Sequence, residues 1–378
     1  MDEKQFNFSE MQKNRKLIRK RKIIRRTLNI ICSIVLVLSI ILTGGMGYYI
    51  FGLSNVKINA QGTDSDSYED LYKSNNSGVS YILVAGLCPP EEGGKLTDTL
   101  IVACLDHDKK TLNFLQIPRD LYIGDEDGSI YGGGKINAVY GSPRSGETGI
   151  NALRRVISNY LGIPLDHYVL FNIPAFINVI DALGGLTINI TNSTGIDIMD
   201  YNTKVHHRVG PGWVTLKGSL ATGFIRKRTG VSDGYYRGDA DRVQSQQLAY
   251  VALAKKLKNM SVSQMYKVAT NCFNEISTDI PLNDILGYAL EVKGMSMDSM
   301  GVYAVPGQYC SYHGYSVYSV HKQNYIDIYN KNLNPYGKPL TDDSIMIYEY
   351  YRTVGESFDP SDEVSGGTLA SIEGEKKQ

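Results

Sequence analysis

The sequence predicts a layered α/β domain with a mixed central sheet, preceded by one membrane-spanning helix. Strand-like and helical segments alternate from residue 81 onward, which is typical of α/β domains. Two neighbouring strand-like segments are joined by a short turn, so part of the sheet should be antiparallel. A long uncharged run precedes the domain, and 378 residues with 42% apolar side chains suffice for a sizeable core.

The first expected strands lie close together in the chain. Residues 81–87 are apolar throughout, which predicts a strand buried on both faces. Residues 99–105 and 111–117 are two further strand candidates, and the polar turn at 106–110 predicts that they form a hairpin.

Helices and strands then alternate. Ile150, Leu153, Ile157 and Leu161 recur at helical spacing and predict one helix. A second helix is expected at 175–183, after Pro174 and before a pair of glycines. The other expected elements are strands at 168–171 and Leu186–Ile190 and a long helix at 240–257.

The net charge of zero is the sum of two oppositely charged parts of the chain. The first 26 residues carry ten Lys or Arg against three acids, a charge of +7, and the rest carries −7. The uncharged run from Thr27 to Val56 follows directly and is long enough to span a bilayer. Basic residues flanking a span stay in the cytoplasm, so the remainder is expected outside a cell membrane crossed once.

Two other interpretations of this N-terminus are weaker. A removable signal peptide would have an apolar region of about 7–15 residues and a small-residue cleavage site. Here the run is longer, and Tyr48, Tyr49 and Phe51 resemble an interfacial aromatic belt. A basic arm that binds nucleic acid is disfavoured by the adjoining apolar run, so no nucleic-acid partner is expected.

These features divide the chain into six expected parts. They are a basic cytoplasmic arm (1–26), a transmembrane anchor (27–53), an extracellular stalk (54–80), a main domain (81–256), a C-terminal extension packing on it (257–350) and a disordered tail (351–378). The stalk is rich in Ser, Asp and Asn, and the tail is polar and rich in Gly and Ser. The cysteines show no metal-binding spacing; Cys88 and Cys104 either pair in an oxidising exterior or are buried thiols.

Three segments place charged side chains where strand or helix geometry would gather them. Arg119 and Asp120 follow Pro118 at the end of an expected strand. Arg226 and Arg228 are two residues apart, so in a strand they would face the same way and could bind a phosphate between them. Each pattern also has an ordinary structural explanation, as a solvated face or a surface ion pair.

The third segment begins the expected long helix. Asp239, Arg242 and Gln246 are three and four residues apart and so form one polar stripe. Carboxylates mixed with several arginines favour a site for a metal and a phosphate, although each pattern alone is weak evidence.

Together these segments resemble the LytR-CpsA-Psr family of bacterial envelope proteins over about residues 81–256. The blocks that carry the resemblance occur in the family's order: Lys95 to Leu100, Gln116 to Asp120, Lys135 to Ala138, Val179 to Gly185, Leu216-x-Gly218 with Arg226-x-Arg228, and Asp239-x-x-Arg242 with Gln246. The family fold is a central sheet between helices with an apolar pocket for a polyprenyl tail.

The resemblance implies an extracellular glycopolymer–peptidoglycan phosphotransferase. Such an enzyme moves an anionic glycopolymer, of the wall teichoic acid or capsular polysaccharide type, from a polyprenyl-pyrophosphate carrier to a peptidoglycan hydroxyl. Asp98 would hold Mg²⁺ (or Mn²⁺), with Asp98, Arg119, Arg226, Arg228 and Asp239 as catalytic residues. Arg119, Arg226, Arg228, Arg242 and Gln246 would bind the pyrophosphate, and phosphoryl transfer needs mainly such positioning and charge.

Three positions depart from the family pattern. Cys88 stands where the family usually has an Asp, and Leu96 and Ser245 replace arginines. These departures favour an alternative function, in which a catalytically degenerate member binds polyprenyl phosphate lipid as an envelope scaffold or regulator. Pyrophosphate hydrolysis, with water as the acceptor, is a third hypothesis.

Overall fold

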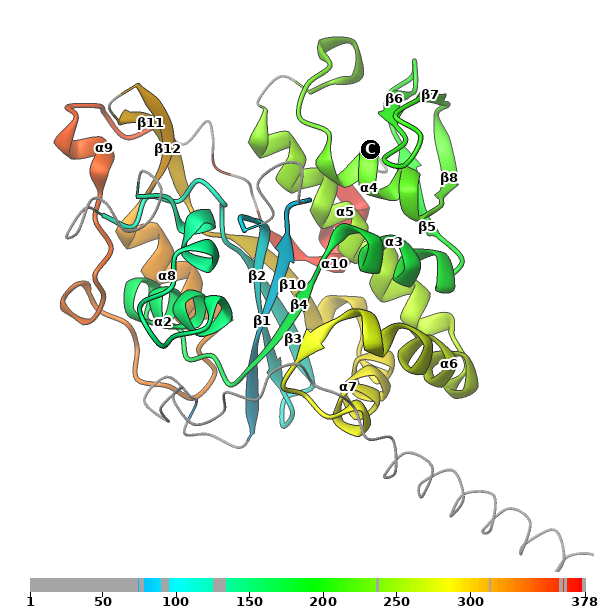
Figure 1. Cartoon of the computed structure of the whole chain (residues 1–378), viewed down its shortest axis with the longest axis horizontal. Helices are drawn as coiled ribbons and strands as arrows, with labels where there is room; N and C mark the ends of the chain where they lie inside the picture. The colour runs from blue at the N-terminus through cyan, green and yellow to red at the C-terminus, as the bar shows by residue number, and fades with distance from the viewer. Residues whose placement is uncertain are drawn as a thin grey trace, which may run out of the picture. The chain divides into compact units, whose positions relative to one another are not determined.

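A seven-stranded mixed sheet forms the centre of the fold (Figure 1). The computed structural model describes residues 74, 78–89, 95–124, 134–235, 238–312, 314–359, 363 and 366–375. The strands of the sheet, in spatial order, are β13 (Gly367–Thr368), β10 (Met300–Ala304), β3 (Thr111–Gln116), β2 (Thr97–Asp106), β1 (Val79–Leu87), β4 (His167–Phe171) and β9 (Ser277–Thr278).

The sheet is mixed because hairpins and crossovers both contribute to it. β1, β2 and β3 pair antiparallel, which confirms the expected hairpin. β4 joins β1 in parallel, and β10 joins β3 in parallel. The predicted α/β fold with a mixed central sheet is therefore confirmed.

Three pairs of short strands lie outside the central sheet. They are β5 (Leu186–Ile190) with β8 (Gly212–Leu216), β6 (Ile196–Met199) with β7 (His206–Val209), and β11 (Gly307–Tyr312) with β12 (Tyr315–Val320). The helices are α2 (Gly149–Leu161), α3 (Ile173–Ala182), α4 (Gly218–Arg226), α5 (Asp239–Asn259), α6 (Val262–Cys272), α7 (Leu282–Gly294), α8 (Lys322–Asn332), α9 (Tyr350–Thr353) and α10 (Leu369–Glu375).

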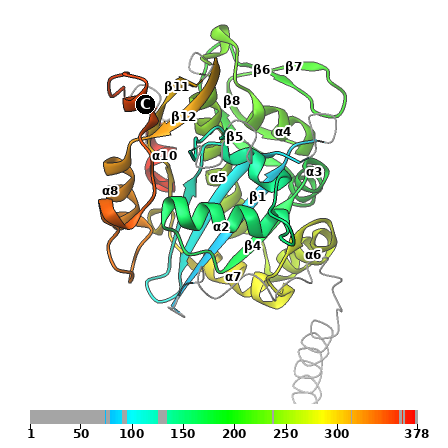
Figure 2. The same cartoon turned by 60° about the vertical axis from the view of Figure 1, so that its left-hand side comes forward.

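Helices cover both faces of the sheet because alternate residues of each strand point to opposite sides. Leu83 and Ala85 of β1 belong to a core that includes Leu153 of α2 and Tyr325 of α8. Ile82, next to Leu83 in the same strand, belongs to a second core with residues of α5, α7 and α10. Figure 2 shows α2 in front of the sheet and α5 on its other side.

A third hydrophobic core positions the helices that form one wall of the pocket described below. It joins α3, α4 and the two strand pairs β5–β8 and β6–β7 to one face of α5, through residues such as Ile198, Phe224 and Ala252. α4 and the start of α5 are thereby held against the end of the central sheet.

The expected parts of the chain differ from the structure at three boundaries. The first residues of β1 lie in the expected stalk, whose limit was residue 80. β10 is a buried strand of the central sheet, so the segment 257–350 does not simply pack on a finished domain. The expected disordered tail contains β13 and α10, so that prediction is wrong for Gly367 to Glu375.

The last helix is ordered because it completes the second core. Leu369 is fully buried and Ile372 is 8% exposed, both against the sheet face that carries Val302. The composition of the tail does not indicate this packing, because the two apolar residues lie among Gly, Ser and Glu. The predicted cytoplasmic arm and membrane anchor lie outside the described residues, and none of the described helices has the length and apolarity to cross a membrane.

We expect Leu369→Ala to lower the free energy of unfolding by about 2–4 kcal/mol, because a buried Leu leaves a cavity in a packed core. Chemical denaturation of the full chain measures the difference. The control Val354→Ala changes a residue that is 39% exposed, and it should stay within about 0.5 kcal/mol of the parent. Equal effects of the two substitutions would contradict the packing of α10.

Candidate functional site

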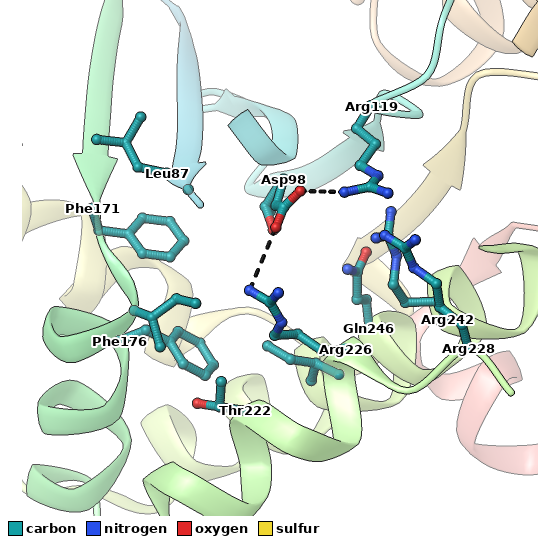
Figure 3. Close-up of a pocket in the computed structure, with 14 residues that line it drawn as sticks. Leu87, Asp98, Arg119, Phe171, Phe176, Thr222, Arg226, Arg228, Arg242 and Gln246 are labelled. Atoms are coloured by element: carbon teal, nitrogen blue, oxygen red, sulfur yellow. Dashed lines mark hydrogen bonds and ion pairs between the residues drawn. The ribbon is translucent and has the colours of Figure 1, made fainter. Parts of the chain in front are cut away.

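A pocket of about 220 Å³ opens at one end of the central sheet (Figure 3). The ends of β1 and β4, the beginning of β2 and the segment after β3 supply one wall, and α3, α4 and α5 supply the other. Its lining residues are Gly86, Leu87, Asp98, Thr99, Arg119, Phe171, Ile173, Phe176, Thr222, Ile225, Arg226, Arg228, Arg242 and Gln246. The pocket thus lies beyond the carboxyl ends of the parallel strands β1 and β4, where α/β sheets commonly bind ligands.

Asp98 lies between two arginines from distant parts of the chain. Arg119 donates a short hydrogen bond to Asp98 Oδ1, and Arg226 Nη1 lies 3.4 Å from Asp98 Oδ2. Their side chains are 16% (Asp98), 20% (Arg119) and 31% (Arg226) exposed, so the cluster is largely shielded yet open to a ligand. Among the described residues that line this pocket, Asp98 is the one carboxylate, against four guanidinium groups.

Arg228, Arg242 and Gln246 lie on the same side of the pocket as Arg119 (Figure 3). Gln246 accepts a hydrogen bond of 3.1 Å from the side-chain amide of Gln116, at the end of β3. Arg242 is only 5% exposed. The sequence therefore predicted correctly that these residues converge, but the role of Gln116 as a support for Gln246 was missed.

The expected strand around Arg226 and Arg228 is wrong. Arg226 ends helix α4, and Lys227 is its C-terminal cap in an extended conformation. The helix forms because Phe224 and Ala221 pack into the third core, whereas the Arg-x-Arg spacing alone would also fit one face of a strand. Both arginines still line the pocket, since the chain leaves the helix between them.

Close backbone contact fixes α4 at the pocket. A Cβ atom on Gly218 would lie 2.3 Å from the carbonyl oxygen of Ile177, so only glycine allows α4 to approach α3. Asp181 accepts a 2.9 Å hydrogen bond from the backbone N–H of Gly218. The blocks Val179 to Gly185 and Leu216-x-Gly218 are thus structural, because they set the position of Arg226.

Arg119 is held in place by its own neighbours. Asp120 Oδ2 lies 3.7 Å from Arg119 Nε, and Lys135 Nζ lies 3.0 Å from Asp120 Oδ1. The backbone N–H of Asn137 donates to the carbonyl oxygen of Arg119 over 3.2 Å. The Lys135 to Ala138 block therefore supports the segment that carries Arg119.

The opposite side of the pocket is apolar. Leu87, Phe171 and Phe176 lie together there, and the two phenyl rings have centroids 6.1 Å apart (Figure 3). None of them was predicted as a site residue. The available signal was position alone, since Leu87 and Phe171 end the parallel neighbours β1 and β4, and Phe176 lies in the first turn of the helix after β4.

The other residues singled out in the sequence analysis are not among the described residues that line the pocket. Asp239 is the first residue of α5, and its side chain is outside the described part of the structure. Cys88 and Leu96 are joined by a 2.9 Å backbone hydrogen bond next to the pocket, and neither lines it. Ser245 faces away, with its hydroxyl 2.6 Å from that of Tyr235.

The structure also decides the state of Cys88 and Cys104. Both are buried thiols, and no disulfide joins them. The register of β1 with β2 places Cys104 opposite Tyr81, at the other end of β1 from Cys88. Burial raises the pKa of the Cys104 thiol to about 12, so this thiol is not a nucleophile at neutral pH.

A metal at this site would depend on the substrate for most of its ligands. Within the described residues no cluster of three or more His, Cys, Asp or Glu could hold a metal ion. Mg²⁺ in phosphoryl-transfer sites is commonly held by one or two carboxylates together with substrate phosphates. Asp98 provides one carboxylate, so the residues present fit a magnesium ion that binds together with a pyrophosphate.

The segment after Arg228 is secured by a buried acid, Asp233. Its carboxylate lies 2.6 Å from Arg208 and 3.0 Å from Lys227, and it accepts a hydrogen bond from the backbone of Asp197. Burial alone would raise the pKa of Asp233, but the hydrogen bonds from Lys227, the Asp197 backbone and Arg208 outweigh it and hold the pKa below its usual value.

We expect Asp233→Asn to cost about 2–3 kcal/mol of stability at pH 7, because it leaves two cations without their buried partner. A carboxyl with a lowered folded-state pKa stabilises the fold above its unfolded pKa, which is near 4, and this contribution is lost as the pH falls through the folded pKa. The difference between parent and variant should therefore shrink below about pH 4. Denaturant titrations from pH 3 to 8 measure it, with the exposed Asp343→Asn as the control; a constant difference would contradict the ionic role.

Comparisons with known proteins agree with this geometry. A model of the LytR_cpsA_psr family matches residues 48–334. The chain is 26% identical to the polyisoprenyl-teichoic acid–peptidoglycan teichoic acid transferase TagU of Bacillus subtilis, over 73% of this chain and 85% of that protein. It is 29% identical to the regulatory protein MsrR of Staphylococcus aureus, over 58% of this chain and 62% of that protein. The crystal structure of B. subtilis TagV has the same fold, with a TM-score of 0.56 at 23% identity, covering 68% of this chain and 97% of that one.

Proposed function

Because this chain belongs to the LytR_cpsA_psr family, we propose that it is a glycopolymer–peptidoglycan phosphotransferase. It would take an anionic glycopolymer from a polyprenyl-pyrophosphate carrier and attach it to a hydroxyl of peptidoglycan. The basic arm and the uncharged run at the N-terminus support a single membrane anchor, with the described domain outside the cell. The name of the relative TagU supports the class of reaction.

The observation that carries the proposal is the division of one pocket into two chemically different halves. Four arginines and Asp98 form one half, and Leu87, Phe171 and Phe176 form the other. A pyrophosphate attached to a hydrocarbon chain has the same division, with a head of high negative charge next to an apolar tail. Arginines bind phosphate oxygens in pairs of hydrogen bonds, and the phenyl rings can cover the first isoprene units.

The proposed reaction requires mainly charge neutralisation and positioning. The acceptor hydroxyl attacks the phosphorus that carries the polymer, and the phosphoanhydride bond breaks. The electron pair leaves with polyprenyl phosphate, and the hydroxyl proton passes to solvent or a base. Arg119 and Arg226 lie where they can stabilise the negative charge on the transferred and leaving phosphates.

Asp98 would hold Mg²⁺, which when bound adds further charge neutralisation to the pyrophosphate. Asp98 also contacts both Arg119 and Arg226. The carboxylate would therefore also orient these two guanidinium groups for the substrate. Gln246, fixed by Gln116, can donate its amide N–H groups to a substrate oxygen.

The experiment that tests the function uses the full chain in lipid nanodiscs. Undecaprenyl-pyrophosphate-linked oligosaccharide and peptidoglycan fragments are supplied, and mass spectrometry follows the transferred product and the released undecaprenyl phosphate. We expect transfer that depends on the acceptor. Release of lipid phosphate without transfer would show hydrolysis, and an unchanged substrate would contradict both reactions.

We expect Phe176→Ala to raise KM for the long-chain carrier about tenfold, because an apolar contact worth about 1–2 kcal/mol is lost. Affinity for inorganic pyrophosphate should not change, since the phenyl ring lies on the apolar side. Kinetics with carriers of long and very short prenyl chains measure the split. An equal loss for both carriers would contradict the tail-binding role.

A second candidate function is favoured by Cys88 and by the relative MsrR, whose name describes a regulatory protein. A member without turnover would bind the lipid and act as a scaffold or regulator. The double substitution Cys88→Asp with Leu96→Arg separates the two. A gain of activity from a parent that binds the carrier but does not turn it over supports this second function, and a parent that is already active excludes it.

A further inference from the structure

The hairpin β6–β7 lies next to the helix that carries part of the arginine cluster. It packs beside α4, the helix that ends at Arg226 (Figure 1). A Cβ atom on Gly223 of α4 would lie 2.0 Å from the carbonyl oxygen of Met199, so glycine is required for this close approach. The position of the hairpin relative to Arg226 is therefore set by backbone contact.

The turn of this hairpin is tied to α4 by polar contacts as well. Asp200 Oδ1 accepts hydrogen bonds from the hydroxyls of Thr203 and Ser219, and Ser219 belongs to α4. The backbone N–H of Tyr201 donates to the carbonyl oxygen of Ser219 over 3.3 Å. The turn is consequently a preorganised part of the pocket surroundings.

Tyr201 connects the pocket with an exposed cation. The guanidinium carbon of Arg226 lies 5.7 Å from the centroid of the Tyr201 ring, and Lys204 Nζ lies 4.0 Å from the same centroid. Asp98, Arg226, Tyr201 and Lys204 thus form a continuous series from the pocket to the surface. Because both cations lie close to the same ring, one segment of a substrate can contact both.

Lys204 occupies a backbone conformation that lysine disfavours. Its φ angle is +60°, the left-handed region in which Gly or Asn is usual. A lysine there is strained relative to glycine. In this conformation the ammonium group of Lys204 lies over the Tyr201 ring. A glycine would fit the backbone better but would supply no charge there.

We propose that Tyr201 and Lys204 form a subsite for the first anionic group of the glycopolymer beyond the pyrophosphate. Lys204 binds that group, a phosphodiester or a carboxylate, and the Tyr201 ring supports the sugar before it. The inference rests on the proposed function, since it identifies the part of the same substrate that follows the pyrophosphate. It explains how a chain with a net charge of −7 beyond residue 26 guides an anionic polymer to its pocket.

The substitution Lys204→Gly tests the subsite without damaging the fold. Glycine relieves the left-handed strain, so the melting temperature should stay equal or rise. Lys110→Gly is the matched control, because Lys110 is also exposed, has a φ angle of +55° and lies at the opposite end of β2 from Asp98.

Binding is measured on the full chain in nanodiscs at constant ionic strength with three oligomers of equal length. One is a poly(glycerol phosphate), one a uronic-acid oligosaccharide and one a neutral chitin oligosaccharide. We expect the parent to prefer at least one anionic oligomer, which identifies the anionic group, and Lys204→Gly to weaken that binding about threefold to tenfold. Lys110→Gly should bind as the parent does.

Unchanged anionic binding by Lys204→Gly overturns the subsite, and so does an equal loss for charged and neutral oligomers. The same nanodiscs are titrated with farnesyl pyrophosphate, which reports on the pocket alone. Failure of the parent to bind farnesyl pyrophosphate would count against the proposed function, whereas the oligomer comparison decides the subsite separately. Tyr201→Phe, which keeps the ring, should retain the preference, and Tyr201→Leu should reduce it.

Discussion

Arg119→Ala is expected to lower kcat/KM for polymer transfer by about 10³-fold, the range found when a charge-stabilising group is removed from a transition state. Arg119 lines the pocket at 20% exposure and contacts Asp98 directly. The substitution removes a guanidinium from the pyrophosphate and also leaves Asp98 with one arginine, Arg226. Both changes act on the reacting phosphates, so kcat should fall more than the affinity for the carrier.

The matched control for this substitution is Arg352→Ala. Arg352 is 67% exposed and pairs with Glu349, the residue that caps its own short helix, so its removal should leave transfer unchanged. Arg119→Lys keeps the charge but loses the paired geometry of the guanidinium, and it should recover only part of the rate. Steady-state kinetics on the nanodisc preparation measure all three variants. An Arg119→Ala variant within tenfold of the parent would contradict a role for Arg119 in the transition state.

Local patterns were sufficient to predict the first half of the fold. The apolar strand β1, the hairpin β2–β3 and the helices α2, α3 and α5 follow from runs and spacings within each segment. β10 and β13 were not predicted as parts of the central sheet, because a strand of five or two residues gains its burial from neighbours distant in the chain. Tertiary packing decides such elements.

The same distinction applies to the site. The family blocks identified Asp98, Arg119 and Arg226, and the structure brings all three together. The family resemblance implies an apolar pocket, but the residues that form it, Phe171 and Phe176, could not be predicted, because phenylalanines at helix and strand ends are usually core residues. Their proposed role depends on facing a cavity beside a charged cluster, which is a property of the folded chain only.

The second large effect is expected for Asp98→Asn, which should lower kcat by about 10²–10³-fold while preserving the fold. Asp98 is the one carboxylate among the pocket-lining residues that the structure describes, and it faces Arg119 and Arg226. Its negative charge opposes an incoming pyrophosphate unless a cation is present. If Asp98 acts mainly as a metal ligand, the variant in EDTA should therefore bind farnesyl pyrophosphate as tightly as the parent or more tightly, although it turns the carrier over more slowly.

Addition of Mg²⁺ separates the two roles of Asp98. If Asp98 holds the metal, Mg²⁺ tightens binding of farnesyl pyrophosphate to the parent and not to Asp98→Asn, and calorimetric titrations with and without the ion measure this difference. If Asp98 only orients Arg119 and Arg226, the variant responds to Mg²⁺ as the parent does but binds more weakly under every condition. Full turnover by Asp98→Asn would contradict both roles. It would show that the four arginines alone neutralise the pyrophosphate, a result that would also explain why Cys88 can stand where the family usually has a second carboxylate.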